Sequence, residues 1–246
     1  MDRLIYTAAS GAKHILEQQA TVSHNLANAT TVGFRAQLDS FRAVHVLGEG
    51  LPTRTFVVDS TVGHDFSQGA TQQTGRDLDV AIQGKGWIAV ETPGGSEAYT
   101  RHGNFKLSEQ GLLQTADGKN VLGDSGPIAI PPDVTVTIGR DGTVSAQATG
   151  IKPGATTVLG RIKLVNPPED NLLRGDDGLF RTKDGQAPDA DPLVAVMGGA
   201  LESSNVNPVD SMVNMITLAR NFEMHMSLLK NAENNASKAG QLLALG

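Results

Sequence analysis

Apolar residues recur at alternating steps of three and four near both ends of the chain. Such a 3.5-residue repeat predicts an amphipathic helix whose apolar stripe packs against another helix. The helix is predicted to end before Gly33, because the β-branched residues at 30–32 and the glycine disfavour its continuation. The N-terminal stripe consists of Ile5, Ala8, Ala12, Ile15, Gln19, Val22, Leu26 and Ala29.

The C-terminal repeat follows a helix-start signal. Asn207 can cap the helix, Pro208 suits its first position, and Asp210 lies where the helix dipole favours a negative charge. A lone helix of this length is marginal in water, so each stripe is expected to pack against the other or against another subunit. The C-terminal stripe consists of Met215, Leu218, Phe222, His225, Leu229, Ala232, Ala236, Ala239 and Leu243, and only His225 interrupts its apolar character.

Short strand-like runs lie between the two helices, and turn signals separate them. The runs are residues 55–58, 78–82, 87–90, 134–138 and 161–165. Asp-Gly pairs at 117–118, 141–142 and 177–178 predict tight turns. Because no amphipathic helix separates these runs, the middle is predicted to be all β. The predicted fold class is therefore mainly β, a β-rich central domain flanked by N- and C-terminal α-helices that pair in a coiled-coil-like core.

This pattern divides the chain of 246 residues into four segments. We expect an N-terminal assembly helix at 1–33, an extended linker or β segment at 34–75, a β-rich body at 76–200 and a C-terminal assembly helix at 201–246. Aromatic residues make up only 4% of the chain, so the core must be built mainly from aliphatic side chains.

Composition and charge argue against several classes of partner. The net charge is −6 and no basic cluster is present, so nucleic acid is not an expected partner. No apolar run approaches the roughly 18 residues that span a bilayer, so membrane insertion is not expected. The N-terminus lacks the apolar region of a cleaved signal peptide. The absence of cysteine excludes disulfides, thiolate nucleophiles and cysteine-based metal sites.

Candidate chemistry is weak throughout the sequence. The six histidines lack the i, i+4 spacing of a zinc helix. The residues at 84–86, Gly-Lys-Gly, lack the spacing of a phosphate loop and are interpreted as a hairpin turn. Asp77 and Asp79 are interpreted as a solvated strand face rather than as an acid/base pair. We therefore predict no catalytic residue, no cofactor and no metal site. A periplasmic β-rich enzyme or binding module remains the alternative of a different class.

Asn25 and Asn28 share one face near the end of the first helix. Asparagine is a poor helix former, so the pair can mark a fraying helix end. Alternatively, these side chains hydrogen-bond to neighbouring helices and fix their register, as buried asparagine does in coiled coils.

Three segments together resemble the axial proteins of the bacterial flagellum, the group of rod, hook and hook-associated proteins. They are HNLANATTVGFR at 24–35, YTRHGNF at 99–105 and GALESSNVN at 199–207, and RNFE at 220–223 adds to the third. The opening MDRLIY and the modest length are most similar to the proximal members of the basal-body rod family. Distal rod proteins are the alternative, because the shared motifs do not separate the two. His102 departs from the pattern, since this position is often acidic in the family.

The resemblance implies a structural subunit of the proximal rod that polymerises through its terminal helices into a torque-transmitting drive shaft. It also implies export by the flagellar type III apparatus without a cleaved signal peptide, and a place in the periplasmic basal body. The implied partners are other rod subunits and the export apparatus. We expect the terminal helices to be partly disordered until they meet neighbouring subunits. The expected assembly interface consists of Ile5, Ala12, Ile15, Val22, Asn25, Leu26, Asn28, Met215, Leu218, Phe222, Leu229 and Leu243.

Overall fold

The structure of the protein is a computed structural model that describes residues 2–45, 55–148 and 156–244. The chain divides into two compact units. One, the terminal unit, comprises residues 1–29, 35–65 and 206–246. The other, the body, comprises residues 30–34 and 66–205.

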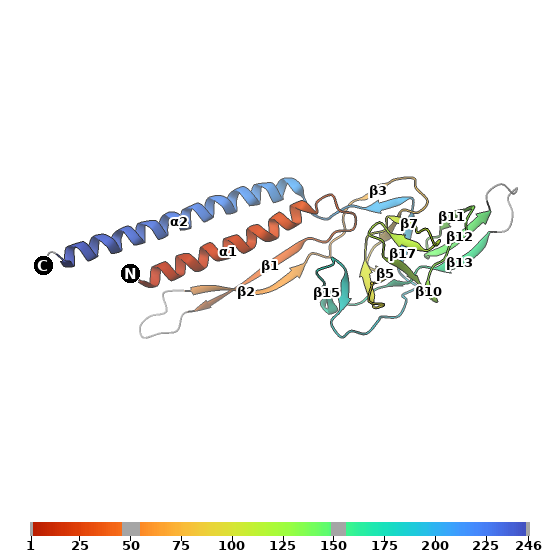
Figure 1. Ribbon diagram of the computed structural model, residues 1–246, viewed down its shortest axis with the longest axis horizontal. Coiled ribbons are helices and arrows are strands. Elements are labelled where there is room, and N and C mark those ends of the chain that lie inside the picture. The colour runs from red at the N-terminus through yellow and green to blue at the C-terminus, as the bar shows by residue number, and fades with distance from the viewer. Residues whose placement is uncertain (1, 46–54, 149–155, 245–246) are drawn as a thin grey trace. The chain divides into compact units, whose positions relative to one another are not determined.

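The terminal unit consists of two long helices and a β-hairpin. Helix α1 spans Asp2–Ala27 and helix α2 spans Pro208–Ala244, and the two pack along each other (Figure 1). Strands β1 (Gln37–His45) and β2 (Thr55–His64) form an antiparallel hairpin that packs against α1. The predicted fold class, mainly β with terminal helices that pair, is confirmed.

Asn207 caps α2 as the sequence predicts. Its side-chain oxygen accepts hydrogen bonds from the backbone N–H groups of Val209 and Asp210, at 3.0 and 3.4 Å. Its side-chain amide donates to the carboxylate of Asp210 at 2.7 Å. These bonds satisfy N–H groups that have no partner within the helix and so define where α2 begins.

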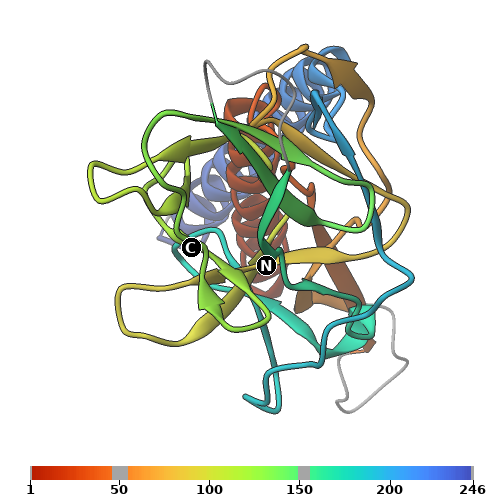
Figure 2. The ribbon, with the colours of Figure 1, turned by 90° about the vertical axis from the view of Figure 1, so that its right-hand side faces the viewer.

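The body is built from short antiparallel strands (Figure 2). The largest sheet has nine strands, with β15-β16-β6-β5-β9-β8-β7 in order, β10 beside β9 and β14 beside β5. Smaller sheets are β11-β12-β13, β17-β4 and β18-β3. The strands are β3 (Thr71–Gln73), β4 (Val80–Gln83), β5 (Trp87–Glu91), β6 (Glu97–Thr100), β7 (Phe105–Leu107), β8 (Leu113–Thr115), β9 (Asn120–Gly123), β10 (Gly126–Pro127), β11 (Val134–Ile138), β12 (Thr143–Ala148), β13 (Thr157–Arg161), β14 (Leu164–Val165), β15 (Leu172–Arg174), β16 (Phe180–Thr182), β17 (Ala195–Gly198) and β18 (Ala200–Glu202), with a short 3-10 helix at Glu169–Asn171.

The core of the body is mainly aliphatic, as the low aromatic content predicts. The main cluster contains buried valines, isoleucines and leucines from most of the strands, with Phe105 as its aromatic member. A second, smaller cluster contains Trp87, Tyr99 and Phe180, with Phe66 packed against it.

The three Asp-Gly pairs form tight turns, and these predictions are confirmed. Gly118, Gly142 and Gly178 have φ angles of 81°, 84° and 78°, and each N–H donates to the carbonyl three residues earlier. A positive φ is readily adopted by glycine, which explains the residue type at these positions. The turns join β8 to β9, β11 to β12 and β15 to β16.

The structure differs from the sequence-based expectations at several boundaries. Helix α1 ends at Ala27 rather than near 33. Helix α2 begins at Pro208, its predicted first position, whereas the segment expected at 201–246 also takes in the end of β18. The segment at 34–75, expected as an extended linker or β segment, contains the β1–β2 hairpin and β3. The run at 161–165 belongs to two strands, β13 and β14. Residues 84–86 do not form a hairpin, because β4 pairs with β17 whereas β5 pairs with β6, β9 and β14.

Candidate assembly surface and motif junction

The buried positions within the described parts of the two helices all belong to the predicted stripes, and they are Ala8, Ala12, Ile15 and Ala232. On α1, Ala12 and Ile15 are buried and Ile5, Val22 and Leu26 are half-buried. The half-buried α2 positions include Met215, Leu218, Phe222 and Leu229, and the side chain of Leu243 lies outside the described residues. Because α2 packs along α1, its half-buried face is the one turned towards α1. Much of the expected interface is therefore used within one chain.

The histidine in the C-terminal stripe has a specific place in this helix pair. A β carbon built on Gly11 would lie only 2.6 Å from Cε1 of His225, so the imidazole ring packs directly against the glycine backbone. A large side chain on α2 thus fills the space left by the smallest residue on α1. This complementarity explains why a polar residue interrupts the stripe.

A second face of α1 binds the hairpin through polar contacts. The hydroxyl of Thr21 donates to the carboxylate of Asp39 at 2.8 Å. The amide of Asn25 donates to the backbone oxygen of Gln37 at 2.9 Å and accepts from the Gln37 N–H at 2.8 Å. Within one chain Asn25 is therefore engaged with strand β1, and the hypothesis that it fixes the register of neighbouring helices stays a prediction.

Asn28 has a different contact near the end of α1. Its side-chain amide donates to the backbone oxygen of His24 at 2.9 Å, within the same chain segment. The same carbonyl also accepts from the backbone N–H of Asn28 at 3.2 Å, so the side chain adds a second hydrogen bond at the end of α1.

The N-terminal half of α2 also carries apolar side chains that α1 does not cover. Met212, Val213 and Ile216 are 53%, 56% and 56% exposed, and Val209 and Met224 are exposed as well. On a helical wheel these five residues fall within one arc on the side of α2 opposite the half-buried stripe. We call this arc the outer face of α2. The predicted stripes do not include this face, although Val209, Met212, Val213 and Ile216 follow the i, i+3, i+4 and i+7 spacing of an apolar helix face.

The segments that carry the family resemblance meet in the body. Arg101, from the middle segment, forms an ion pair with Glu202 of the third segment, with 2.8 Å between Nε and Oε2. The two side chains are 3% and 2% exposed. The N–H of Gly33, from the first segment, donates to the backbone oxygen of Glu202 at 2.7 Å.

The remaining motif residues also pack the body. A β carbon on Gly103 would lie 1.7 Å from the carbonyl oxygen of Val80, so only glycine fits there. Burial raises the pKa of the Tyr99 hydroxyl, and the neighbouring Glu97 carboxylate raises it further. Asp79 is buried and accepts hydrogen bonds from Thr74 and Arg76, at 2.7 and 3.1 Å. The interpretation of Asp79 as part of a solvated strand face was therefore wrong.

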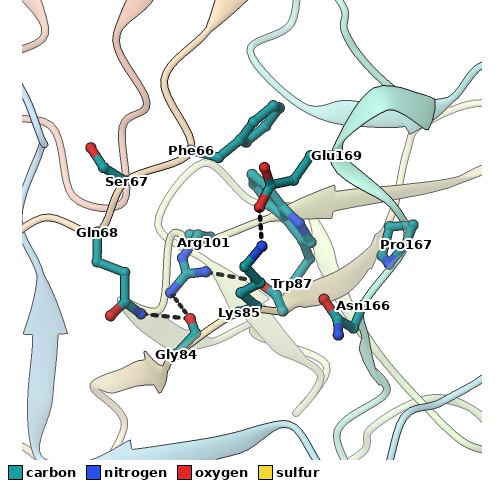
Figure 3. A pocket seen from close by; sticks show the side chains of 11 residues that line it. Phe66, Ser67, Gln68, Gly84, Lys85, Trp87, Arg101, Asn166, Pro167 and Glu169 are labelled. Carbon is teal, nitrogen blue, oxygen red and sulfur yellow. Dashed lines mark hydrogen bonds and ion pairs between the residues drawn. The ribbon is translucent and has the colours of Figure 1, made fainter.

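A pocket with a volume of about 270 Å³ lies beside Arg101 (Figure 3). Phe66 and Trp87 line it, and Lys85 and Glu169 form an ion pair of 2.8 Å at its edge. The Arg101 guanidinium donates a hydrogen bond to the backbone oxygen of Gly84, in the Gly-Lys-Gly sequence at 84–86, at 2.9 Å. Glu169 is the only carboxylate among the residues that line this pocket. A glycan hydrolase, one form that the alternative β-rich enzyme could take, generally uses two carboxylates.

Two further observations concern the described residues only. Over these residues, His, Asp and Glu side chains do not gather into any group of three that could hold a metal ion. Over the same residues, neither α1 nor α2 is long and apolar enough to cross a membrane.

Comparisons with known proteins agree with this arrangement. Residues 5–35 match the family described as flagella basal body rod protein, residues 81–146 match the flagellar hook protein FlgE/F/G D1 domain, and residues 197–242 match the flagellar basal body rod FlgEFG protein C-terminal family. These ranges cover most of α1, much of the body and most of α2 respectively.

Full-length relatives point to one branch of the family. The chain is 47% identical to the flagellar basal-body rod protein FlgF of Escherichia coli and 46% identical to that of Salmonella typhimurium, with 100% of each chain covered. It is 32% identical to the flagellar basal-body rod protein FlgG of Bacillus subtilis, over 95% of this chain and 96% of the relative. The chain therefore belongs to the flagellar basal-body rod protein family, and within that family it is FlgF-like.

Proposed function

We propose that the chain is a structural subunit of the proximal flagellar rod and that it assembles through its terminal unit. The observation that carries the proposal is the helix pair. The predicted apolar stripes of α1 and α2, which we call the inner stripes, face each other. The outer face of α2 presents exposed apolar side chains. The full-length identity to FlgF proteins supports the place in the rod.

The outer face of α2 supplies a physical reason for association. Burying a large apolar side chain gains roughly 1.5–3 kcal/mol, so half-exposed Met212, Val213 and Ile216 together leave several kcal/mol that a neighbouring subunit can recover. Contact between an outer face and a different surface of the next copy is heterologous. Repeated heterologous contacts build an open helical assembly rather than a closed ring, and this is the geometry of a rod.

The same helices fit the route to the rod that we propose. The flagellar export apparatus delivers the subunit to the periplasm, and the terminal helices complete their folding when they meet neighbouring rod subunits. The ordering cost of a helix is then offset by subunit contacts, which limits polymerisation before export.

A structural role without catalysis is the simplest interpretation of the body. The charged groups of its described pocket are engaged in ion pairs and hydrogen bonds, as Lys85 is with Glu169 and Arg101 with Gly84. The residues of the family motifs pack the core or hold glycine backbones in close contact. We therefore propose that the body stabilises the subunit rather than binding a substrate.

Electron microscopy of basal bodies tests this function. We expect basal bodies purified from a strain that lacks the protein to stop at an incomplete rod, and we expect the returned gene to restore the full rod. A complete rod in the strain that lacks the protein would contradict the proposal.

The distal rod remains the alternative position, and labelling can separate the two. A small epitope inserted at 149–155 of the body and gold-labelled antibody would mark the subunit along purified rods. We expect the label near the inner end of the rod. A label at the outer end would favour the distal position.

A further inference from the structure

The body and the terminal unit are joined by four covalent crossings. They lie at the peptide bonds 29–30, 34–35, 65–66 and 205–206. Any force that passes along the chain between the units passes through these bonds. The segments of the body that lead to them are residues 30–34, 66–70 and 202–205.

One residue, Glu202, belongs to segment 202–205 and binds to both of the other segments. Its backbone oxygen accepts from the N–H of Gly33 at 2.7 Å, and its Oε1 accepts from the N–H of Gly69 at 3.1 Å. Glu202 itself is the last residue of β18 and the first residue of segment 202–205. We infer that Glu202 is a positioning residue that holds the segments leading to all four crossings in one fixed register on the body.

The neighbouring backbone bonds extend the same register. The N–H of Asn205 donates to the carbonyl of Phe34 at 3.4 Å, and the N–H of Ser203 donates to the carbonyl of Ala70 at 2.8 Å. The side-chain amide of Asn205 donates to the carbonyl of Ser67 at 3.1 Å. Segment 202–205 therefore lies between the other two segments and is bonded to both.

Two glycines make this close approach possible. A β carbon on Gly33 would lie 2.4 Å from the carbonyl oxygen of Arg101, and one on Gly69 would lie 1.9 Å from the carbonyl oxygen of Ser203. Both obstacles are backbone atoms, which cannot rotate away as a side chain can. A larger residue at 69 would separate segment 66–70 from segment 202–205, and one at 33 would push segment 30–34 away from the backbone of Arg101.

Arg101 fixes the direction of the Glu202 carboxylate. Its Nε holds Oε2 at 2.8 Å, which leaves Oε1 for Gly69. The guanidinium is itself held by the carbonyls of Gly84 and Gly86, each at 2.9 Å (Figure 3). These glycines lie between β4 and β5, where Gly86 is buried and Gly84 is exposed. The Glu202 carboxylate offers one oxygen to each of two donors, the Arg101 Nε–H and the Gly69 N–H. A glutamine at 202 has one acceptor oxygen, so its NH₂ group would face one of these donors.

The inference is tested by amide hydrogen exchange of the full chain with Glu202→Gln. We expect exchange at Gly69 to accelerate about tenfold or more, because its N–H loses a carboxylate acceptor. Gly33 keeps its backbone acceptor, and its exchange should accelerate with that of Gly69 only because Glu202 no longer fixes the register, while exchange in β5 stays unchanged. Glu169→Gln is the matched control, because it removes the same charge from an exposed ion pair with Lys85 and should change neither site.

Two results would overturn the inference. One is an unchanged exchange rate at both Gly33 and Gly69. The other is an equal acceleration throughout the body, β5 included, which would mean that Glu202 stabilises the whole body and positions nothing in particular. If the Glu202→Gln chain does not fold, Arg101→Lys is measured by the same criteria, because lysine keeps the charge but cannot reach the glutamate and both turn carbonyls together.

The register of the crossings does not depend on the place of the chain in the rod. Its mechanical use does depend on the proposed function, because a drive shaft must carry load between the units of each subunit. Exchange on the purified chain tests the register alone, so its failure is distinguishable from a failure of the rod proposal.

Discussion

Gly11 of α1 and His225 of α2 are in direct contact, and a β carbon on the glycine would approach the imidazole ring to 2.6 Å. Within the described residues, Nδ1 of His225 is buried and has no hydrogen-bond partner. The imidazole therefore contributes shape rather than a hydrogen bond at this point. A small residue facing a large one fixes the lateral position of the two helices at this point.

This contact predicts coupled mutations. Gly11→Leu should destabilise the helix pair by about 1–3 kcal/mol, because the larger side chain forces the helices apart. Combined with His225→Ala, the same substitution should cost much less, since the alanine leaves room. Urea unfolding followed by circular dichroism measures both. Additive costs in the double variant would show that the two positions are not in contact.

The two faces of α2 should respond differently to the same kind of substitution. Leu218→Gln on the inner stripe is expected to lower the free energy of unfolding of the helix pair by about 1–3 kcal/mol. Ile216→Gln on the outer face should change it by less than about 0.5 kcal/mol, because the side chain is already largely exposed. Swimming in soft agar should nevertheless fall with Ile216→Gln. Normal swimming in this variant would exclude the outer face as a subunit contact.

Gly33 should tolerate substitution less than another glycine with the same backbone conformation. Gly33 and Gly75 have φ angles of 67° and 71°, but only Gly33 faces a backbone atom within 4 Å of a β carbon. Gly75→Ala is expected to cost about 1–2 kcal/mol for the left-handed conformation alone. Gly33→Ala adds a clash with the Arg101 carbonyl and should cost clearly more. Equal costs in denaturant unfolding would contradict the close packing of the motif segments.

Much of the terminal unit could be predicted from the sequence, because a helix stripe is a local pattern. Asn207 as a cap and the Asp-Gly turns are equally local, since each depends on residues adjacent in the chain. The pairing of β3 with β18 could not be predicted, because these strands are short and far apart in the sequence. Strands of two or three residues carry no periodicity to detect.

The contacts made by residues of the motif segments could not be predicted from the sequence either. Arg101 and Glu202 read as ordinary charged residues until the fold buries both of them together. Asn25 shows the opposite limit, because its type and position suggested a buried polar contact, but the partner is a strand rather than a helix. For Asn25 the sequence indicates a polar contact, and the structure identifies Gln37 as the partner.

The turn at Asp177 predicts a defined pH dependence. Hydrogen bonds from the Arg181 side chain, and next from the Leu179 backbone, lower the pKa of the Asp177 carboxyl below its ordinary value. The folded state therefore binds this proton less readily than the unfolded state, so the carboxylate stabilises the fold above pH of about 4, and the contribution is lost as pH falls through the lowered pKa.

Asp177→Asn should remove this contribution. Because the ion pair is more than a third exposed, we expect a loss of no more than about 1 kcal/mol at neutral pH, and no difference from the unchanged protein well below pH 3. Urea unfolding across the acid range measures the difference. A gap that stays constant into strong acid would contradict the electrostatic origin.

The most direct test of assembly through the terminal helices is an aspartate placed in either inner stripe. Val22→Asp and Leu218→Asp should each abolish rod assembly and motility, while circular dichroism and proteolysis show the β body still folded. Ser23→Asp, one position away on an exposed part of α1, adds the same charge without entering the stripe and should leave the helices paired. Normal motility with either stripe variant would contradict the account.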